Sequence, residues 1–292
     1  MRFCILTHNV ASHFVDRTSR SFEKLGHTAE VVDFADVRFS VRDGVAKVVL
    51  AKDGGDIAGD FDACLARPLG KRELSEFLFS INTLSALSQN GLAVVNDPGA
   101  YLLASSKLSQ YLALSVRGLP VPSTESSLNP DEVLRSASSG TCLIEKPVCG
   151  SRGTGVRKVQ PGLESRRDLR AVVLYQQYLM TARADIRAFT VGHRVIAAMR
   201  RNSSSLAANI SRGGRPERVE LTDDLIRLAE DASKATGAEI SGVDMMLDRE
   251  GRPYVLEVNA QPDFIGLEKV SEVDVALAIS DYVVRRAQSR NA

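Results

Sequence analysis

This 292-residue chain has almost no net charge, few cysteines and no long apolar run. The formal net charge is only +1, so composition gives no reason to expect nucleic acid or an anionic membrane as a partner. No apolar run approaches the roughly 20 residues that a membrane helix needs. The apolar stretch at residues 3–6 is too short for a signal peptide and is typical of a first strand. We therefore expect a cytoplasmic protein that binds neither nucleic acid nor membrane.

The few cysteines are scattered along the chain and form no cluster. They are Cys4, Cys64, Cys142 and Cys149. No Cys-x-x-Cys pair occurs, which disfavours disulfides and zinc and predicts buried, reduced thiols. The chain also shows no Ser/His/Asp or Cys/His set of the kind that nucleophilic catalysis uses.

The first hundred residues alternate short apolar strand patterns with helical ones. This alternation predicts a small α/β lobe with a largely parallel sheet. Within it, the segment Arg42-Asp43-Gly44 separates two strand patterns, at 37–41 and 45–50, and predicts a hairpin.

From residue 141 onward the chain is rich in strand patterns. A clear helix at 223–235 interrupts them, with Thr222 as N-cap and Gly237 after its last turn. A second amphipathic helix, at 273–288, closes the chain. At this length, two or three packed lobes are expected.

Oxygen-bearing side chains interrupt two apolar strand patterns near the C-terminus, at 242–247 and 253–259. Glu257 and Asn259 are two apart, so both point to one face of a strand. If Glu250-Gly251 is a two-residue turn, Asp244 lies directly opposite Glu257. If the loop has four residues instead, Asp244 stays on the same face but is displaced from Glu257 by one residue pair.

Two carboxylates and an amide oxygen that converge on one face repel one another unless a cation lies between them. Hard oxygen donors of this kind suit Mg²⁺ or Mn²⁺. The alternative is an ordinary solvent-facing strand edge, which the strongly apolar flanking residues disfavour.

Glycines at 150, 153 and 155 follow Lys146 and stand between two strand patterns. A strand–loop–strand excludes the Rossmann fingerprint and the Walker loop, both of which open a helix. Glycines let backbone amides approach phosphate oxygens, and Lys146 can add a positive charge. Taken alone, the segment would be read as a flexible hairpin; its coincidence with the acidic hairpin favours a phosphate loop.

The segment from Gln176 to Leu179 leaves a strand pattern, so its backbone groups could pair with the edge of a base, and Asp185 could bind ribose hydroxyls. Arg200 and Arg212 could bind phosphate or carboxylate oxygens in bidentate geometry. Three further arginines are interpreted as solvated surface charges: Arg201, Arg215 and Arg218.

In chain order, these features resemble the ATP-grasp superfamily. The matching features are Lys107, Lys146 before its glycine loop, Gln176–Leu179, Asp185-Ile186-Arg187, Asn209 with Arg212-Gly213-Gly214, Asp244 and Glu257-Val258-Asn259. The chain is most similar to RimK-type ligases, which join an amino acid, often glutamate, to a carboxylate acceptor. The resemblance covers roughly residues 63–290. It implies an architecture of α/β and α+β lobes: an N-terminal α/β lobe at 1–97 and two α+β lobes, at 98–180 and 181–292, that clamp ATP.

The resemblance also implies a role for each matching residue. The ATP phosphates would be bound by Lys107, Lys146, Gly150, Ser151, Arg152, Gly153, Thr154 and Gly155. Adenine would be held by Gln176, Gln177, Tyr178 and Leu179, and ribose by Asp185. Two Mg²⁺ or Mn²⁺ ions would be bound by Asp244, Glu257 and Asn259. The γ-phosphate and the reaction intermediates would be stabilised by Arg187, Arg200, Asn209 and Arg212.

The chain departs from the family pattern at the expected substrate end of the cleft. Ala260-Gln261-Pro262-Asp263 stands where the family usually has Ala or Ser, Ser, Pro, Gly, and Ser211 stands where RimK has His. Gln261 and Asp263 are therefore candidate substrate residues. Arg67, at the C-terminal end of a strand pattern where ligands gather in α/β sheets, is a candidate acceptor contact.

Together these implications predict a carboxylate–amine ligase. A carboxylate attacks the γ-phosphate of ATP to give an acyl phosphate and ADP, and an amine then attacks the activated carbonyl. The partners would be ATP, an amino acid (glutamate by resemblance) and an acceptor that is a small molecule, a coenzyme or a peptide tail. Homo-oligomers are common among relatives. Two alternatives stay open: carboxylation or phosphorylation of a small acid on the same fold, and a non-catalytic nucleotide-binding module.

Overall fold

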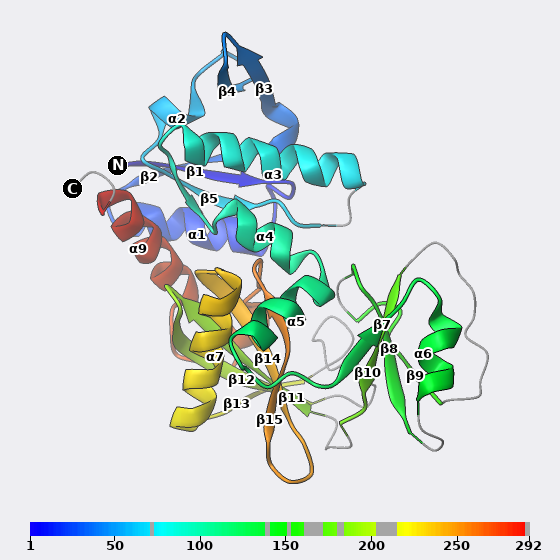
Figure 1. Ribbon diagram of the computed structural model, residues 1–292. Coiled ribbons are helices and arrows are strands. Elements are labelled where there is room, and N and C mark those ends of the chain that lie inside the picture. Colours follow the sequence, from blue (N-terminus) through cyan, green and yellow to red (C-terminus); the bar gives the residue numbers. More distant parts are fainter. Residues whose placement is uncertain are drawn as a thin grey trace.

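The computed structural model describes residues 1–70, 73–137, 141–150, 153–160, 172–179, 184–202 and 215–289. Figure 1 shows an N-terminal α/β lobe above a larger C-terminal sheet, with a smaller sheet to one side. The expected combination of α/β and α+β parts is confirmed. None of the described helices is both long and apolar enough to cross a membrane.

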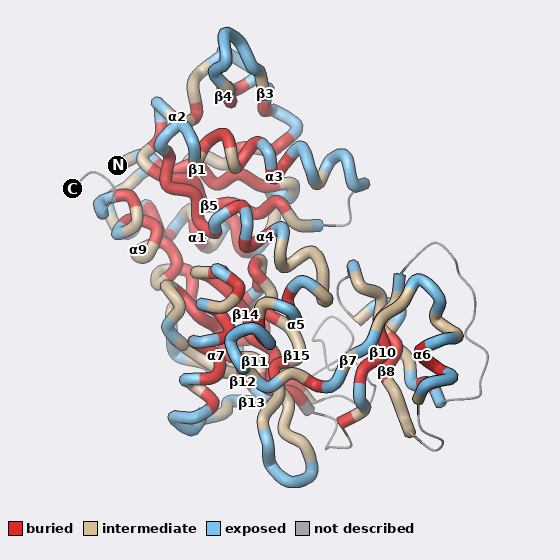
Figure 2. The backbone as a smooth tube through the Cα atoms, viewed as in Figure 1, coloured by how far each residue is buried: buried red, intermediate tan, exposed pale blue. Residues whose placement is uncertain are grey.

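A parallel sheet forms the N-terminal lobe, as predicted. Its strand order is β2-β1-β5-β6, from β1 (Arg2–Thr7), β2 (Thr28–Asp33), β5 (Ala63–Arg67) and β6 (Ala93–Val95). The central strands β1 and β5 are almost completely buried (Figure 2), as expected for a parallel sheet covered on both faces. α3 (Leu74–Gln89) shares a core cluster with one face, and α1 (His13–Lys24) and α9 (Val275–Gln288) share one with the other.

The predicted hairpin is also present, formed by β3 (Val37–Arg42) and β4 (Val45–Leu50). Asp43 and Gly44 have φ of 51° and 76°, as a tight two-residue turn of this kind requires. Two short elements that the sequence did not reveal flank it: the 3-10 helix η1 (Phe34–Asp36) and α2 (Ile57–Asp60).

A small antiparallel sheet lies beside these parts, with the order β7-β10-β8-β9. Its strands are β7 (Thr124–Ser126), β8 (Leu143–Pro147), β9 (Arg157–Val159) and β10 (Val173–Gln177), and α6 (Pro130–Ser136) packs against it. Within the described ranges its own core cluster consists of four buried residues, Val133, Leu134, Val159 and Tyr175, whereas the buried Leu174 of β10 belongs to the larger core cluster of the molecule. This lobe therefore has little apolar packing of its own.

The C-terminal lobe is a five-stranded antiparallel sheet with the order β13-β12-β11-β14-β15. The strands are β11 (Ala184–Val191), β12 (Arg194–Asn202), β13 (Arg215–Arg218), β14 (Ile240–Leu247) and β15 (Pro253–Asn259). α7 (Asp223–Thr236) packs on one face of this sheet. It begins at Thr222, whose side chain accepts from the Leu225 amide, and ends at a left-handed Gly237, as predicted.

Two helices join the lobes. α4 (Pro98–Ala104) and α5 (Lys107–Val116) contact α3, α7 and β15, so they pack with the N- and C-terminal lobes although the expected division grouped them with residues 98–180. The side chain of buried Asn96 adds a direct tie between lobes. Its amide donates to the Ile240 and Ala260 carbonyls at 2.8 and 2.7 Å and accepts from the Ile240 amide at 2.7 Å.

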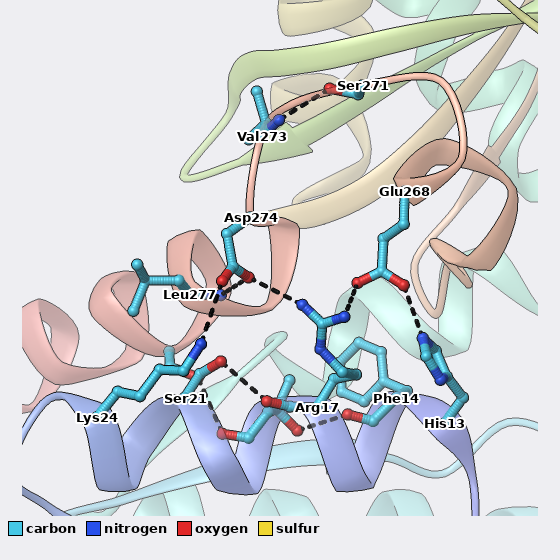
Figure 3. Close-up of polar contacts among 12 residues, drawn as sticks. His13, Phe14, Arg17, Ser21, Lys24, Glu268, Ser271, Val273, Asp274 and Leu277 are labelled. Atoms are coloured by element: carbon cyan, nitrogen blue, oxygen red, sulfur yellow. Dashed lines mark hydrogen bonds and ion pairs between the residues drawn. The ribbon is translucent and has the colours of Figure 1, made fainter.

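The chain returns to the N-terminal lobe through α8 (Ile265–Glu268) and α9. Figure 3 shows side chains of α1 reaching this returning segment. Arg17 lies 2.8 Å from Glu268 and 3.4 Å from Asp274, and His13 contacts Glu268 at 2.7 Å. The first helix and the last part of the chain are thus joined by ion pairs.

All four cysteines are free thiols, but only Cys4 and Cys64 are buried as predicted, whereas Cys142 is half-buried. Cys4 and Cys64 are buried next to each other on β1 and β5, and Cys149 is exposed.

Candidate active site

The β14–β15 hairpin brings Asp244 opposite Glu257, as predicted, but by a different route. The turn is not Glu250-Gly251 alone: residues 248–252 separate the two strands, closed by a 2.9 Å hydrogen bond from the Asp248 amide to the Arg252 carbonyl. Met245 then pairs with Val255, whereas Asp244 pairs with Glu257, which leaves Leu256 as an extra residue on β15. This β-bulge restores the opposition that a two-residue turn would have given.

Asp244 is buried in a network of charges. Arg187, directly opposite on β11, donates to both of its oxygens at 2.7 Å, and Arg201 Nη2 lies 2.8 Å from Oδ2. Burial alone would raise the pKa of Asp244, but the charges and hydrogen bonds of Arg187 and Arg201 outweigh it and lower the pKa to about 2. Asp244 is therefore a fixed anion.

Arg201 also binds Asp185, through two hydrogen bonds of 2.6 and 2.7 Å. Asp185 is buried, and both its oxygens are engaged by Arg201, so its geometry fits a role in holding Arg201 better than the expected contact with ribose. The network is thus a chain of four charged groups: Asp185, Arg201, Asp244 and Arg187.

The prediction that Arg201 is a solvated surface charge was wrong, because it is only 1% exposed. Arg215 and Arg218 are exposed, as predicted. Arg200 is exposed too, and because side chains alternate along β12 it points to the face opposite Arg201. The structure therefore brings Arg201, not Arg200, to Asp244. The apolar Met199 two residues before Arg201 was the signal that this face is buried.

Two lysines approach the same hairpin from the small lobe and from α5. Lys107, the first residue of α5, donates to the Gly150 carbonyl at 3.0 Å, and its Nζ lies 3.6 Å from Glu257 Oε1. Lys146 on β8 donates to Gln176 Oε1 at 2.6 Å. Burial lowers the pKa of Lys146 to about 8, more than the neighbouring carboxylates Glu257 and Asp244 raise it. An anionic ligand would relieve this cost.

The glycine segment is a strand–loop–strand, as predicted, between β8 and β9. Gly155 has φ of +77°, and a Cβ there would lie 2.8 Å from Pro147 Cγ, so the loop folds back on Pro147 in a way that only glycine permits. Gly153 and Thr154 lie in the same described turn. Four of the expected site residues fall outside the described residues: Ser151, Arg152, Asn209 and Arg212.

The predicted adenine segment, Gln176–Leu179, begins in the last two residues of β10 and continues beyond the strand. The Gln177 amide donates to the Ser123 carbonyl at 2.9 Å and the Tyr178 amide to the Cys142 carbonyl at 3.3 Å, so both amides are already used within the small lobe. The buried Gln176 side chain accepts from Lys146 and donates to Thr124 Oγ1 at 3.1 Å. Leu179 is buried.

The candidate substrate residues meet beyond Asn259. Arg67, 9% exposed, donates to the Pro262 carbonyl at 3.3 Å and lies 3.7 Å above the centroid of the Phe14 ring. Burial lowers its pKa to about 10, although exposed Asp263 raises it. Gln261 instead binds the Leu69 backbone at both ends of its amide, at 2.7 and 3.0 Å, so it fixes the loop that follows Arg67.

The oxygen donors fit a hard divalent cation. Asp244, Glu257 and Asn259 lie on one face of the hairpin. Asp244 Oδ2 already has two partners, Arg187 and Arg201, whereas Asp244 Oδ1 has only Arg187 and keeps a lone pair for a metal, as do the Glu257 oxygens. No cluster of three or more His, Cys, Asp or Glu suitable for a metal occurs in the described ranges, so the set rests on two carboxylates and one amide. The charged side chains around it carry one more positive than negative charge. The cations are Lys107, Lys146, Arg187 and Arg201, and the carboxylates are Asp185, Asp244 and Glu257. This balance favours an anion that carries a metal, such as a phosphate–metal complex.

A family model, curated relatives and solved structures were compared with this chain, and all three kinds of match are to ATP-grasp proteins or glutamate ligases. A family model described as RimK-like ATP-grasp domain matches residues 104–283. A protein of Vibrio vulnificus (strain YJ016) named probable alpha-L-glutamate ligase is 29% identical over 300 residues, which cover 99% of this chain and 97% of that protein. The structure of the ATP-grasp ligase PsnB, complexed with a phosphomimetic variant of minimal precursor, Mg and ADP, has a TM-score of 0.74 at 25% identity, covering 97% of this chain and 98% of that one. A RimK domain ATP-grasp protein from Sphaerobacter thermophilus DSM 20745 shares the fold, with a TM-score of 0.70 at 22% identity, covering 97% of this chain and 100% of that one.

Proposed function

Because the chain belongs to the RimK-like ATP-grasp family, whose model matches residues 104–283, we propose that it is an ATP-dependent ligase that joins glutamate to an acceptor carboxylate. The name of the Vibrio vulnificus relative supports glutamate as the amino acid. The observation that carries the proposal is the convergence of Lys107, Lys146 and the Arg187–Arg201 network on the acidic hairpin, because this arrangement suits a triphosphate with its metal.

Lys107 and Lys146 would bind the ATP phosphates, with the Gly150–Gly155 loop beside them. Lys107 is well placed for this role because it holds the Gly150 carbonyl and approaches Glu257 at once. Asp244, Glu257 and Asn259 would hold a divalent cation, Mg²⁺ or Mn²⁺, which neutralises the charge of the transferring phosphoryl group. Together with Arg187, Arg201 would keep Asp244 ionised and in place. No residue was predicted from the sequence to have this role.

In the first step, an oxygen of the acceptor carboxylate forms a bond to the γ-phosphorus, and the bond from that phosphorus to the bridging oxygen of ADP breaks. The products are an acyl phosphate and ADP. In the second step, the glutamate amine attacks the acyl carbon, the amine loses a proton, and inorganic phosphate leaves with the electron pair of the broken bond. Arginine N–H groups would stabilise the oxyanion.

Arg67 is our candidate for binding a carboxylate of the substrate. Its guanidinium is buried next to the chain that leaves Asn259. Within the described ranges it contacts the Pro262 carbonyl and the Phe14 ring and lies near the charge of Asp263. Because no carboxylate within these ranges pairs directly with this buried cation, the site favours an anionic ligand. The structure of PsnB complexed with precursor peptide PsnA2 supports a peptide as the acceptor, and we propose a peptide carboxylate for this chain.

An ADP-release screen tests the proposal. The protein is incubated with ATP, Mg²⁺ and amino acids, with and without a panel of carboxylate peptides and small acids, and the product mass is measured. We expect ADP release beyond a single turnover only when glutamate and an acceptor are both present, with a product heavier than the acceptor by one glutamate residue. ADP release over many turnovers without any amine, with a stable phosphorylated product, would indicate phosphorylation of the acid. Nucleotide binding with no ADP under any combination would indicate a non-catalytic module.

A further inference from the structure

The bulge in β15 determines which way Glu257 points. The pairing next to the turn, Met245 with Val255, would, if continued, put Leu256 opposite Asp244 and turn Glu257 to the other face of the sheet. Val255 and Val258 occupy that other face and belong to the apolar core beneath α7. Because Leu256 is inserted as an extra residue, Glu257 instead faces Asp244. The acidic site therefore depends on one irregularity in a strand at the edge of the sheet.

Two neighbouring side chains of α5 hold the backbone on either side of Glu257. Tyr111 Oη donates to the Leu256 carbonyl at 2.9 Å, and Gln110 Oε1 accepts from the Val258 amide at 2.8 Å. The other end of the Gln110 amide donates to the Ala104 carbonyl at 3.0 Å, which fixes its direction. Both side chains are buried, and burial raises the pKa of Tyr111, so its hydroxyl stays a neutral donor.

The Tyr111 hydroxyl also contacts the Gln176 side chain, which accepts a hydrogen bond from Lys146. One hydroxyl thus adjoins both the bulge beside Glu257 and the amide that orients Lys146. α5 itself begins with Lys107, 3.6 Å from Glu257. α5 therefore contacts the surroundings of all three groups: it carries Lys107, it holds the backbone beside Glu257, and through Gln176 it adjoins Lys146.

We propose that Tyr111 and Gln110 are positioning residues that hold the β15 bulge and so aim Glu257 at the metal, an inference that rests on the proposed function. They touch neither nucleotide nor substrate in this assignment; they act through the backbone of Leu256 and Val258. Side chains that orient a metal ligand in this way contribute to metal affinity as well as to rate.

The test measures Mn²⁺ binding by the full-length protein in the presence of ADP, with electron paramagnetic resonance as the detection method. Tyr111→Phe removes one hydroxyl and keeps the ring. We expect it to raise the Mn²⁺ dissociation constant on the order of tenfold, to raise the Mg²⁺ concentration that gives half-maximal ADP release, and to leave binding of metal-free ADP unchanged. Gln110→Met should act in the same direction.

Thr18→Val is the control, because Thr18 is buried and its hydroxyl also donates to a backbone carbonyl, that of Phe14 in α1 of the N-terminal lobe, at 2.8 Å. It should lower stability and bind Mn²⁺ like the wild type. Wild-type Mn²⁺ affinity in Tyr111→Phe would overturn the inference. So would an equal loss in Thr18→Val, because the effect would then follow from general destabilisation. A failure of the proposed function itself can be told apart with Glu257→Gln. If Glu257 is not a metal ligand, this variant would bind Mn²⁺ as tightly as the wild type.

Discussion

Among single residues, Arg201 has the largest unexpected role. Its guanidinium contacts two buried carboxylates, Asp185 and Asp244, and this double pairing explains why an arginine is tolerated at 1% exposure. Its neighbour Arg200 is chemically identical but faces the other side of the sheet. The two arginines therefore form a natural comparison.

Replacing Arg201 with Met should destabilise the fold by about 3 kcal/mol or more, because two buried carboxylates lose their shared partner. ADP release should be lost with it, since Asp244 is no longer held. Arg200→Ala should stay close to the wild type in both respects. Chemical denaturation and the ADP assay measure the two effects. A larger loss of activity in Arg200→Ala than in Arg201→Met would return the catalytic role to Arg200.

If Lys146 binds the ATP phosphates as proposed, its lowered pKa makes nucleotide binding depend on pH. Because burial lowers this pKa to about 8, the folded protein releases the proton at a lower pH than the unfolded chain does. The stability of the nucleotide-free protein should accordingly rise as pH increases above about 8. ATP affinity should fall over the same range, because the ammonium proposed to bind phosphate loses its charge.

The measurement is the ATP dissociation constant between pH 7 and 9, with Lys146→Arg as control. Arginine stays protonated in this range, so the variant should show little dependence on pH from this position. An unchanged wild-type affinity across the range would argue that Lys146 does not bind the phosphates as an ammonium.

At the scale of elements, the glycine loop and the acidic hairpin each depend on one local irregularity. The hairpin has the β-bulge at Leu256, and the loop has the left-handed Gly155 packed against Pro147. The bulge turns Glu257 to the face that a regular strand would point it away from, and the left-handed Gly155 lets the loop fold back on Pro147.

Gly155→Ala should weaken ATP binding, because the added Cβ combines an unfavourable φ with a 2.8 Å approach to Pro147 Cγ. Gly118→Ala is the matched control. Its φ of +68° carries similar backbone strain, but no atom lies within 4 Å of the added Cβ. We expect a raised KM for ATP only in Gly155→Ala. Equal values of KM in the two variants would show that the shape of the loop does not matter for the nucleotide.

At the scale of the whole molecule, polar contacts join the N- and C-terminal lobes at several places within the described ranges. They include the ion pairs between α1 and the segment from Glu268 to Asp274, the hydrogen bonds between Gln261 and Leu69, and those of Asn96. Asn96 bonds to Ile240 and Ala260, which stand at the start of β14 and just after β15. It therefore anchors the acidic hairpin to the parallel sheet.

Asn96→Leu should lower the free energy of unfolding by about 3 kcal/mol, because buried backbone groups at Ile240 and Ala260 lose their partners. Asn90→Ala, which removes one exposed hydrogen bond to the Ala46 carbonyl, should cost much less. Equilibrium denaturation compares the two. Equal losses would show that Asn96 does not anchor the lobes.

Local pattern in the sequence was enough for most elements. The parallel sheet, the Asp43-Gly44 hairpin, α7 with its two caps and the strand–loop–strand around Gly155 all follow from periodicity, turn residues and capping, which act within a few positions of the chain. The family resemblance then correctly indicated an ATP-grasp ligase, because motif order and residue type survive in a linear sequence.

Other features were decided only by tertiary structure. The apolar Met199, two residues before Arg201, was the one clue in the sequence to which face of β12 is buried, but that Arg201 meets Asp244 was decided only by the pairing of β12 with β11 and of β11 with β14. The sequence could not show the bulge at Leu256, which needs Tyr111 and Gln110, some 145 residues away, to hold it. Nor could it show that both ends of the Gln261 amide are used by Leu69. The sequence by itself determined which chemical groups the site contains, and long-range packing decided where each one points.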